Sequence, residues 1–189
     1  GRDGLRHAAP QPHVLRRRVE VTLTAELGAA APTVARYRTA VAGGSGTFEF
    51  NSRYDALWSW SVALGDLNGD GALDVVYLQH VTPRGVAVRF NQGDGTLGDA
   101  NLYGTSGASV DVALGDLDGD GDLDLAVAVG GGSEVLVLRN EGDGTFDDPD
   151  VYPVEGMATG VALGDMDGDG DLDLVVAGGD FGTYVFRNK

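Results

Sequence analysis

Nearly the same segment occurs three times in this chain, at an almost constant interval. The copies read LGDLNGDGALD, LGDLDGDGDLD and LGDMDGDGDLD, and their first aspartates are Asp66, Asp116 and Asp165. The steps from 66 to 116 and from 116 to 165 are 50 and 49 residues. A period of this size indicates a repeat architecture, and a unit of four short strands is the arrangement that propeller blades use. The repeats therefore predict an array of similar β units.

Each unit contains apolar runs on both sides of the acidic segment. One run enters it (SVALGD, VDVALGD, TGVALGD), a second leaves it (LDVVYLQH, LDLAVAVG, LDLVVAGG), and a third follows a turn (VAVRFN, EVLVLRN, TYVFRN). The first two runs are apolar at successive positions, which is typical of strands buried on both faces. No window of useful length shows helical periodicity, and the 31 glycines lie mostly between the runs. The predicted class is all-β with antiparallel hairpins.

A second recurring element sets the phase of the units. It follows the third run at residues 91–97 (NQGDGTL) and 140–146 (NEGDGTF), with a degenerate copy at residues 44–48 (GSGTF). Asp-Gly between strands predicts a hairpin turn. With this phase the chain divides into a flexible basic leader at 1–18, a degenerate N-terminal blade without a metal loop at 19–57, complete repeats at 58–106 and 107–156, and a third repeat at 157–189 that lacks its outer strand.

The acidic segments place carboxylates at relative positions 1, 3, 5 and 9, except that Asn68 takes the third position of the first copy. Carboxylates this close repel one another unless a cation neutralises them, and a hard cation with many oxygen ligands, above all calcium, suits such a loop. Surface acidity without a role would not recur three times at this spacing. A catalytic role is disfavoured because calcium would occupy every carboxylate and leave no free base or open metal position.

Composition excludes several classes of protein. The net charge is −16, although residues 1–54 carry eight arginines and only four acidic residues. So acidic a chain lacks the extended basic surface that nucleic-acid binding requires. There are no cysteines, so disulfides are excluded. Metal-binding loops would take over the stabilising role that disulfides often have in secreted domains. No apolar stretch approaches the roughly 20 residues of a membrane-spanning helix.

The paired D-x-D-G-D-G-x-x-D and N-x-G-D-G-T-F elements resemble the FG-GAP repeats of integrin α-subunit propellers, and more closely the VCBS-type repeats of bacterial surface and secreted proteins. The similarity covers roughly residues 43–189. It implies blades of four antiparallel strands in a six- to eight-bladed β-propeller, with calcium in the hairpin loop between the first two strands of a blade. The Phe-Gly and Gly-Ala-Pro signatures are absent, and about three units do not close a ring alone.

The resemblance also implies a ligand set for three calcium ions. Transferred position by position, the side chains at positions 1, 3, 5 and 9 and the carbonyl at position 7 would bind the metal. The sites would be Asp66, Asn68, Asp70, Ala72 and Asp74; Asp116, Asp118, Asp120, Asp122 and Asp124; and Asp165, Asp167, Asp169, Asp171 and Asp173. An EF-hand fits poorly, because its twelfth position should be Glu and is Tyr77, Val127 or Val176 here.

The function that the resemblance implies is non-enzymatic: an extracellular, cell-surface or periplasmic module for adhesion, ligand recognition or scaffolding. The alternative is a noncatalytic part of a secreted enzyme that binds carbohydrate or stabilises the fold. The open array would be a fragment of a longer propeller, would self-associate, or would be completed by a protein partner. Trp58 and Trp60 would share a face of a strand, where we expect core or inter-blade packing, with carbohydrate stacking as the alternative.

Overall fold

The computed structural model describes residues 50–55 and 58–189. The predicted leader at 1–18 and most of the predicted degenerate blade at 19–57 therefore lie outside the described residues. From Ser52 onward the chain belongs to one structural unit, and the three predicted repeats fall within it.

This unit consists of three antiparallel sheets whose strands follow one another in sequence order. The first sheet contains β1 (Val62–Gly65), β2 (Asp74–Gln79), β3 (Gly85–Asn91) and β4 (Leu97–Gly104). The second contains β5 (Ser109–Gly115), β6 (Asp124–Val129), β7 (Glu134–Leu138) and β8 (Asp150–Pro153). The third contains β9 (Gly160–Gly164), β10 (Asp173–Ala177) and β11 (Thr183–Phe186), and a short 3-10 helix (Gly179–Phe181) precedes β11.

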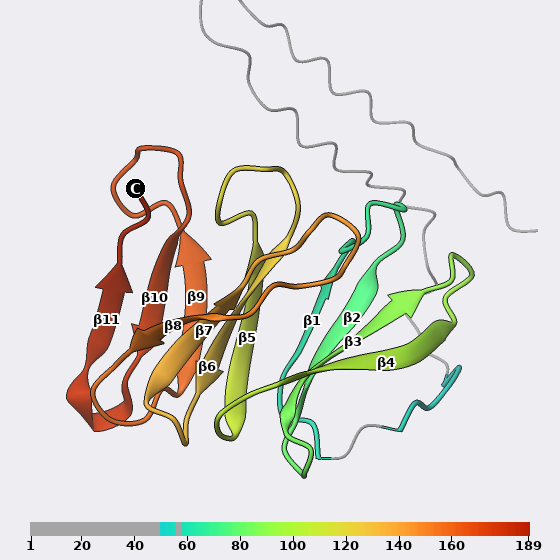
Figure 1. Cartoon of the computed structure of the whole chain (residues 1–189), viewed down its shortest axis with the longest axis horizontal. Helices are drawn as coiled ribbons and strands as arrows, with labels where there is room; N and C mark the ends of the chain where they lie inside the picture. The colour runs from blue at the N-terminus through green and yellow to red at the C-terminus, as the bar shows by residue number, and fades with distance from the viewer. Residues whose placement is uncertain (1–49, 56–57) are drawn as a thin grey trace, which may run out of the picture. The chain divides into compact units, whose positions relative to one another are not determined.

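The sheets stand side by side, with the second between the first and the third (Figure 1). Strand β5 of the middle sheet contacts both β1 and β9, which are the first strands of their own sheets. The prediction of an all-β chain built from antiparallel units is confirmed, and two of the units have four strands. The third sheet has three strands, in the order β11-β10-β9. The residues that the structure describes do not close into a ring.

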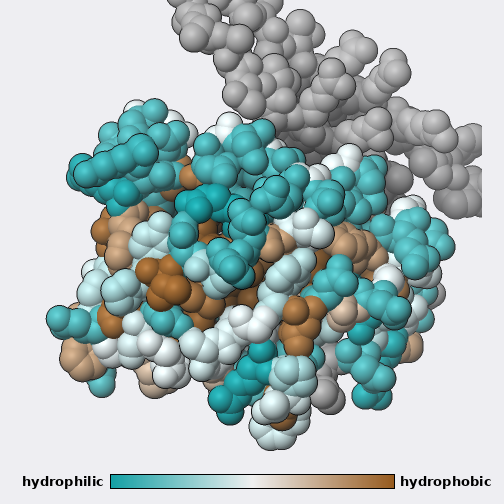
Figure 2. Space-filling model, viewed as in Figure 1, coloured by the Kyte–Doolittle hydropathy of each residue, from teal (hydrophilic) through white to brown (hydrophobic). Residues whose placement is uncertain are grey.

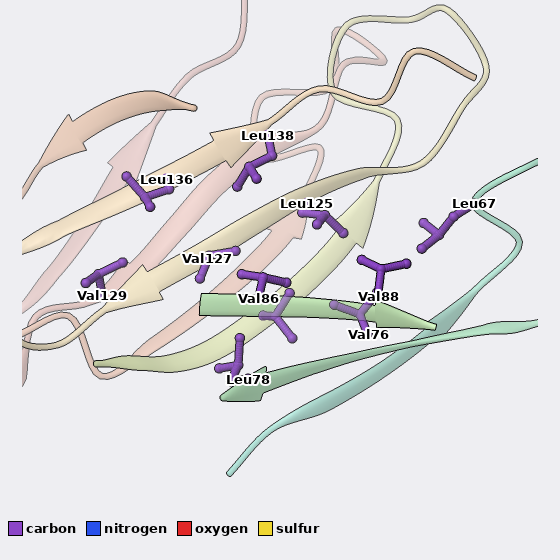
Figure 3. Packing of buried hydrophobic residues seen from close by; sticks show 11 residues of the cluster. Leu67, Val76, Leu78, Val86, Val88, Leu125, Val127, Val129, Leu136 and Leu138 are labelled. Carbon is purple, nitrogen blue, oxygen red and sulfur yellow. The ribbon is translucent and has the colours of Figure 1, made fainter. Parts of the chain in front are cut away.

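Two hydrophobic layers hold the sheets together. The layer between the first and second sheets contains Val76 and Leu78 of β2 against Leu125 and Val127 of β6, and Figure 3 shows these side chains between the two ribbons. The other layer contains Ala126 and Ala128 of β6 with Leu174 and Val176 of β10.

Strand β6 is buried along its whole length, because its side chains alternate between these two layers. The continuous apolar run LDLAVAV thus encodes a strand covered on both faces, as the sequence predicted. Fully burying one such aliphatic side chain contributes about 1.5–3 kcal/mol to stability.

The two tryptophans do not pack as predicted. Trp58 and Trp60 precede β1 outside any strand, and their side chains are 74% and 67% exposed. The prediction that they pack in the core is therefore wrong, and the predicted packing between blades would involve the unit at 19–57, most of which lies outside the described residues. Trp60 instead stacks on His80, with ring centroids 4.3 Å apart.

Hydrophilic residues gather along the edge of the unit where the hairpin loops project (Figure 2). Among the described residues, no helix has the length and apolarity needed to cross a membrane.

Candidate metal centres

Each acidic segment forms the hairpin loop between the first two strands of its sheet. The loop is closed by the same antiparallel pair in every copy: Gly65 with Asp74, Gly115 with Asp124, and Gly164 with Asp173. The three loops lie at the same edge of their sheets (Figure 1). Each acidic segment thus connects the first two strands of its sheet, but only the strands that leave it (β2, β6 and β10) are largely buried. The prediction that the entering runs are also buried on both faces is wrong for β1 and β9, whose residues are mostly half-buried or exposed.

The second and third loops bring three carboxylates together. Oxygen atoms of Asp116, Asp118 and Asp120 lie within 4.8 Å of one another, and so do those of Asp165, Asp167 and Asp173. Three negative charges at this separation repel one another even at the surface. An all-oxygen donor set at this spacing fits calcium, which takes six to eight oxygen ligands. The predicted ligands Asp122, Asp124, Asp169 and Asp171 lie in the same two loops.

The first loop differs because Asn68 replaces an acid. Its side-chain nitrogen donates to Asp70 Oδ2 at 3.1 Å, so part of the repulsion is exchanged for a hydrogen bond. Asp66 Oδ1 is buried and has no hydrogen-bond partner. A buried carboxylate oxygen without a partner is costly, and a cation in the loop would satisfy it. The first loop therefore also fits a metal ion.

The loop backbone folds around the first aspartate. Asp116 accepts hydrogen bonds from the N–H groups of Gly119 at 2.7 Å and Gly121 at 3.0 Å, and Asp165 accepts the same pair from Gly168 and Gly170. Gly121 has φ of 100°, which residues with a Cβ rarely adopt. These hydrogen bonds therefore hold the first carboxylate of the second and third loops against the backbone of its own loop.

The predicted position-7 residues are placed by the acid two residues before them. The N–H groups of Ala72, Asp122 and Asp171 donate to the Oδ1 atoms of Asp70, Asp120 and Asp169 at 2.7, 2.9 and 3.0 Å. These bonds hold the turn at which the predicted carbonyl ligands lie.

The position-9 aspartates have a structural role in addition to the predicted one. Asp124 is fully buried; its Oδ2 accepts the Leu117 N–H at 2.8 Å and its Oδ1 the Asn140 N–H at 2.9 Å. Asp74 and Asp173 make the same two bonds in their sheets. Each carboxylate thus ties the start of its acidic loop to the end of the third strand.

Burial raises the pKa of the Asp124 carboxyl, and the charges of Asp118 and Asp120 raise it further, against the two N–H donors that lower it. Burial therefore makes this carboxylate costly to ionise. A cation in the loop would offset that cost.

Two arginines lie beside the third-position acids. Arg139 Nε is 3.7 Å from Asp118, and Arg187 Nη1 is 3.4 Å from Asp167. In the first sheet the corresponding positions are Phe90 and Asn68, which carry no charge. The arginine and the acid are thus present together in the second and third sheets and absent together in the first.

Sequence reasoning assigned no role to the asparagine that ends each third strand. The amide of Asn140 is buried; it donates to the carbonyl of Leu67 in the first sheet at 2.8 Å and to that of Leu123 at 3.1 Å. Its Oδ1 accepts the N–H groups of Gly142 and Gly144. The sequence feature that could have pointed to this residue is the recurrence of asparagine at the end of VAVRFN, EVLVLRN and TYVFRN.

The family model of the FG-GAP-like repeat matches this chain twice, at residues 74–127 and 116–176. Together the matches cover more than half of the chain and include the second and third acidic loops. The chain belongs to the FG-GAP-like repeat family. A search of curated proteins finds no match. The resemblance that the acidic and Gly-Asp-Gly-Thr elements suggested is therefore confirmed at the level of the repeat.

Proposed function

We propose that this FG-GAP-like repeat protein binds calcium in its three hairpin loops, one ion per loop. The observation that carries the proposal is the convergence of three carboxylate oxygens within 4.8 Å in each of two loops. The buried, unpartnered oxygen of Asp66 supports the same role for the first loop. The ligands would be the fifteen residues named from the sequence, at positions 1, 3, 5, 7 and 9 of each loop.

Calcium would stabilise the protein and would not take part in catalysis. Each ion would neutralise a loop that joins two strands and would release the strain of a crowded set of charges. With a dissociation constant of about 10⁻⁴ M and roughly millimolar calcium, each site would add on the order of 1–1.5 kcal/mol to stability. Three sites would matter against a typical folding stability of about 5–15 kcal/mol.

Thermal unfolding with and without a chelator tests this function. For a chain of this length, about 1 kcal/mol shifts the melting temperature by roughly 2–4 °C, so saturating calcium should raise it by about 6–18 °C. Asp118→Asn keeps the oxygen that accepts the Asp120 N–H but removes one charge. It should reduce the rise in melting temperature that calcium causes, by less than the contribution of one whole site. Asp99→Asn, an exposed acid on β4, serves as the control. An identical melting temperature with calcium and with chelator would refute the proposal.

We further propose that the sheets are propeller-type blades and that the module acts outside the cell in adhesion, ligand recognition or scaffolding of a larger assembly. Membership of the FG-GAP-like repeat family supports this role, as does the side-by-side order of the sheets (Figure 1). Extracellular calcium is abundant enough to fill sites of modest affinity. The proposed role is non-enzymatic.

One observation favours the alternative of a carbohydrate-binding part of a secreted enzyme. The rings of Trp58 and Trp60 are exposed, and exposed aromatic rings provide flat apolar surfaces on which sugars stack. A glycan array on the chain and on Trp60→Ala tests this alternative. Binding that the substitution abolishes would support it, and no binding to any glycan would oppose it.

A further inference from the structure

The two junctions between sheets are built from the same parts. At the first junction, a Cβ placed on Gly65 would lie 2.8 Å from Leu114 Cδ1 and 2.7 Å from Leu123 Cδ1 of the second sheet. At the second junction, a Cβ on Gly115 would lie 2.8 Å from Leu163 Cδ1 and 2.7 Å from Leu172 Cδ1 of the third sheet. At both junctions, two leucines of the following sheet therefore pack directly against a glycine of the preceding sheet, where a Cβ would collide with them.

A polar contact accompanies each leucine pair. Asn140 of the second sheet donates to the Leu67 carbonyl of the first sheet at 2.8 Å. Asn188, at the corresponding position of the third sheet, donates to the Leu117 carbonyl of the second sheet at 2.6 Å. The junction is therefore a repeated set: a glycine and a carbonyl on one sheet, and two leucines and an asparagine on the next.

The outer face of the third sheet carries the first half of this set. Gly164 corresponds to Gly65 and Gly115 by its strand pairing with Asp173, but no atom lies within 4 Å of the position its Cβ would take. Met166 corresponds to Leu67 and Leu117, because its N–H bonds the position-9 aspartate in the same way. Its side chain is 60% exposed, whereas Leu67 is buried.

The outer face of the first sheet carries the second half. Leu64 and Leu73 hold the positions of Leu114 and Leu123 in the repeat, yet they are 60% and 57% exposed. Asn91 holds the position of Asn140 and donates to the Leu73 carbonyl of its own sheet. Within the described residues it has no partner in a preceding sheet.

We propose that a second copy of this chain docks head to tail, with Leu64 and Leu73 of one copy on Gly164 of the other and Asn91 beside the Met166 carbonyl. The occupant is a second copy because the two outer faces hold complementary halves of a junction that the chain forms twice within itself. Such an interface joins different faces, so it closes into a ring when the rotation permits. Two copies supply six of the sheets that the structure describes.

Sedimentation velocity on the full chain in saturating calcium tests the proposal. The wild-type chain of 19.5 kDa should sediment as a dimer, or as a larger whole multiple, at micromolar concentration. Gly164→Leu should fill the receiving surface and yield a monomer without disturbing the fold, since the position has open space. Leu64→Asp with Leu73→Asp should raise the dissociation constant at least roughly 30-fold, as the loss of a central hot spot does.

Two matched controls belong to this experiment. Gly104→Leu also adds a side chain in open space, and Val151→Asp charges an equally exposed apolar position on β8. Both should leave the association unchanged. A wild-type chain that stays monomeric at about 100 µM would overturn the proposal, as would an oligomer that Gly164→Leu leaves intact.

Mixing the two disrupted variants tests the head-to-tail orientation itself. The Gly164→Leu chain retains the leucine face and the double aspartate variant retains the glycine face, so a mixture should form a one-to-one dimer although each alone is monomeric. A dimer that joins identical faces would not be restored by mixing, and that result would overturn the orientation.

The inference extends the proposed role in a larger assembly, and its failure can be told apart from failure of calcium binding. Calorimetric titration of the wild-type chain should give three calcium ions per chain, whether or not the chain associates. Calcium binding without association would refute only the docking proposal. Association without calcium binding would refute only the proposal that the loops bind calcium.

Discussion

Asn140→Ala is the substitution that probes the contact between sheets most sharply. The amide makes four hydrogen bonds: two from its nitrogen to the carbonyls of Leu67 and Leu123, and two to its oxygen from the N–H groups of Gly142 and Gly144. The residue is 4% exposed, so water does not readily replace these partners. Only the bond to Leu67 crosses between sheets.

Asn91 provides the matched control at concentrations too low for two copies to associate, because within one chain it makes the same local bonds without the one between sheets. Its nitrogen donates to the Leu73 carbonyl and its oxygen accepts from Gly93 and Gly95. These groups are exposed, so water replaces them at a net cost of about 0.5–1.5 kcal/mol per bond at most. For these three bonds we expect Asn91→Ala to cost about 1.5–2 kcal/mol, at the low end of the summed range because the groups are exposed.

Asn140→Ala should cost more because it leaves buried groups without partners. An unsatisfied buried donor or acceptor costs about 1–3 kcal/mol, and Leu67, whose carbonyl loses its donor, is itself buried. We therefore expect a loss of roughly 3–5 kcal/mol, at least about 1 kcal/mol beyond that of Asn91→Ala. Urea unfolding of both variants in saturating calcium, with equal m-values, measures the difference. An equal or larger loss for Asn91→Ala would refute the reasoning.

Three further predictions concern the glycine contacts, the first metal loop and one turn. Gly115→Ala should destabilise the chain by about 1–3 kcal/mol through overpacking against the leucines above it, while Gly164→Ala, in open space within one chain, should change the free energy of unfolding by less than about 0.5 kcal/mol; denaturant titration at concentrations too low for two copies to associate compares them. The first loop should bind calcium most weakly, because Asn68 takes the place of an acid. Asn68→Asp should raise the calcium affinity of this loop in a calorimetric titration. A first site that binds calcium more tightly than the other two in the wild-type chain would contradict this prediction. The Thr96 hydroxyl and N–H hold the pKa of Asp94 below its ordinary value. The interaction therefore stabilises the folded state at pH values above the ordinary pKa of the carboxyl, and this stabilisation is lost as the pH falls through the lowered pKa of the folded state. Carboxyl NMR titration should place the Asp94 pKa low and Thr96→Val should raise it; an unchanged value in the variant would contradict this assignment.

Local sequence patterns predicted those parts of the structure that depend on a single unit. The run LDLAVAV predicted a strand buried on both faces, because an uninterrupted apolar run has no solvent-facing side. The loop at Asp116 and its two copies follow from the spacing of acids and glycines. Each of these features is complete within about fifty residues, and the repetition of the pattern strengthened the prediction.

Features that depend on two neighbouring sheets were not predicted from sequence. Asn140 was part of a turn motif, and its bond to Leu67 becomes visible only when the sheets are side by side. Asp124 was predicted as a metal ligand; its two backbone hydrogen bonds lie within one sheet, but they require knowledge of where the third strand of that sheet ends. Trp60 was expected in the core or between blades, because it would share a strand face with Trp58. Burial depends on whether another sheet covers that face, which the local sequence does not state.

The central claim is that the three acidic loops each hold one calcium ion. A crystal structure of the chain grown in millimolar calcium, with anomalous diffraction collected to locate the ions, tests it most directly. The account predicts one anomalous peak in each loop, among the carboxylates that begin at Asp66, Asp116 and Asp165, with oxygen ligands at 2.3–2.6 Å as calcium requires. Loops that stay free of ions under these conditions would contradict it.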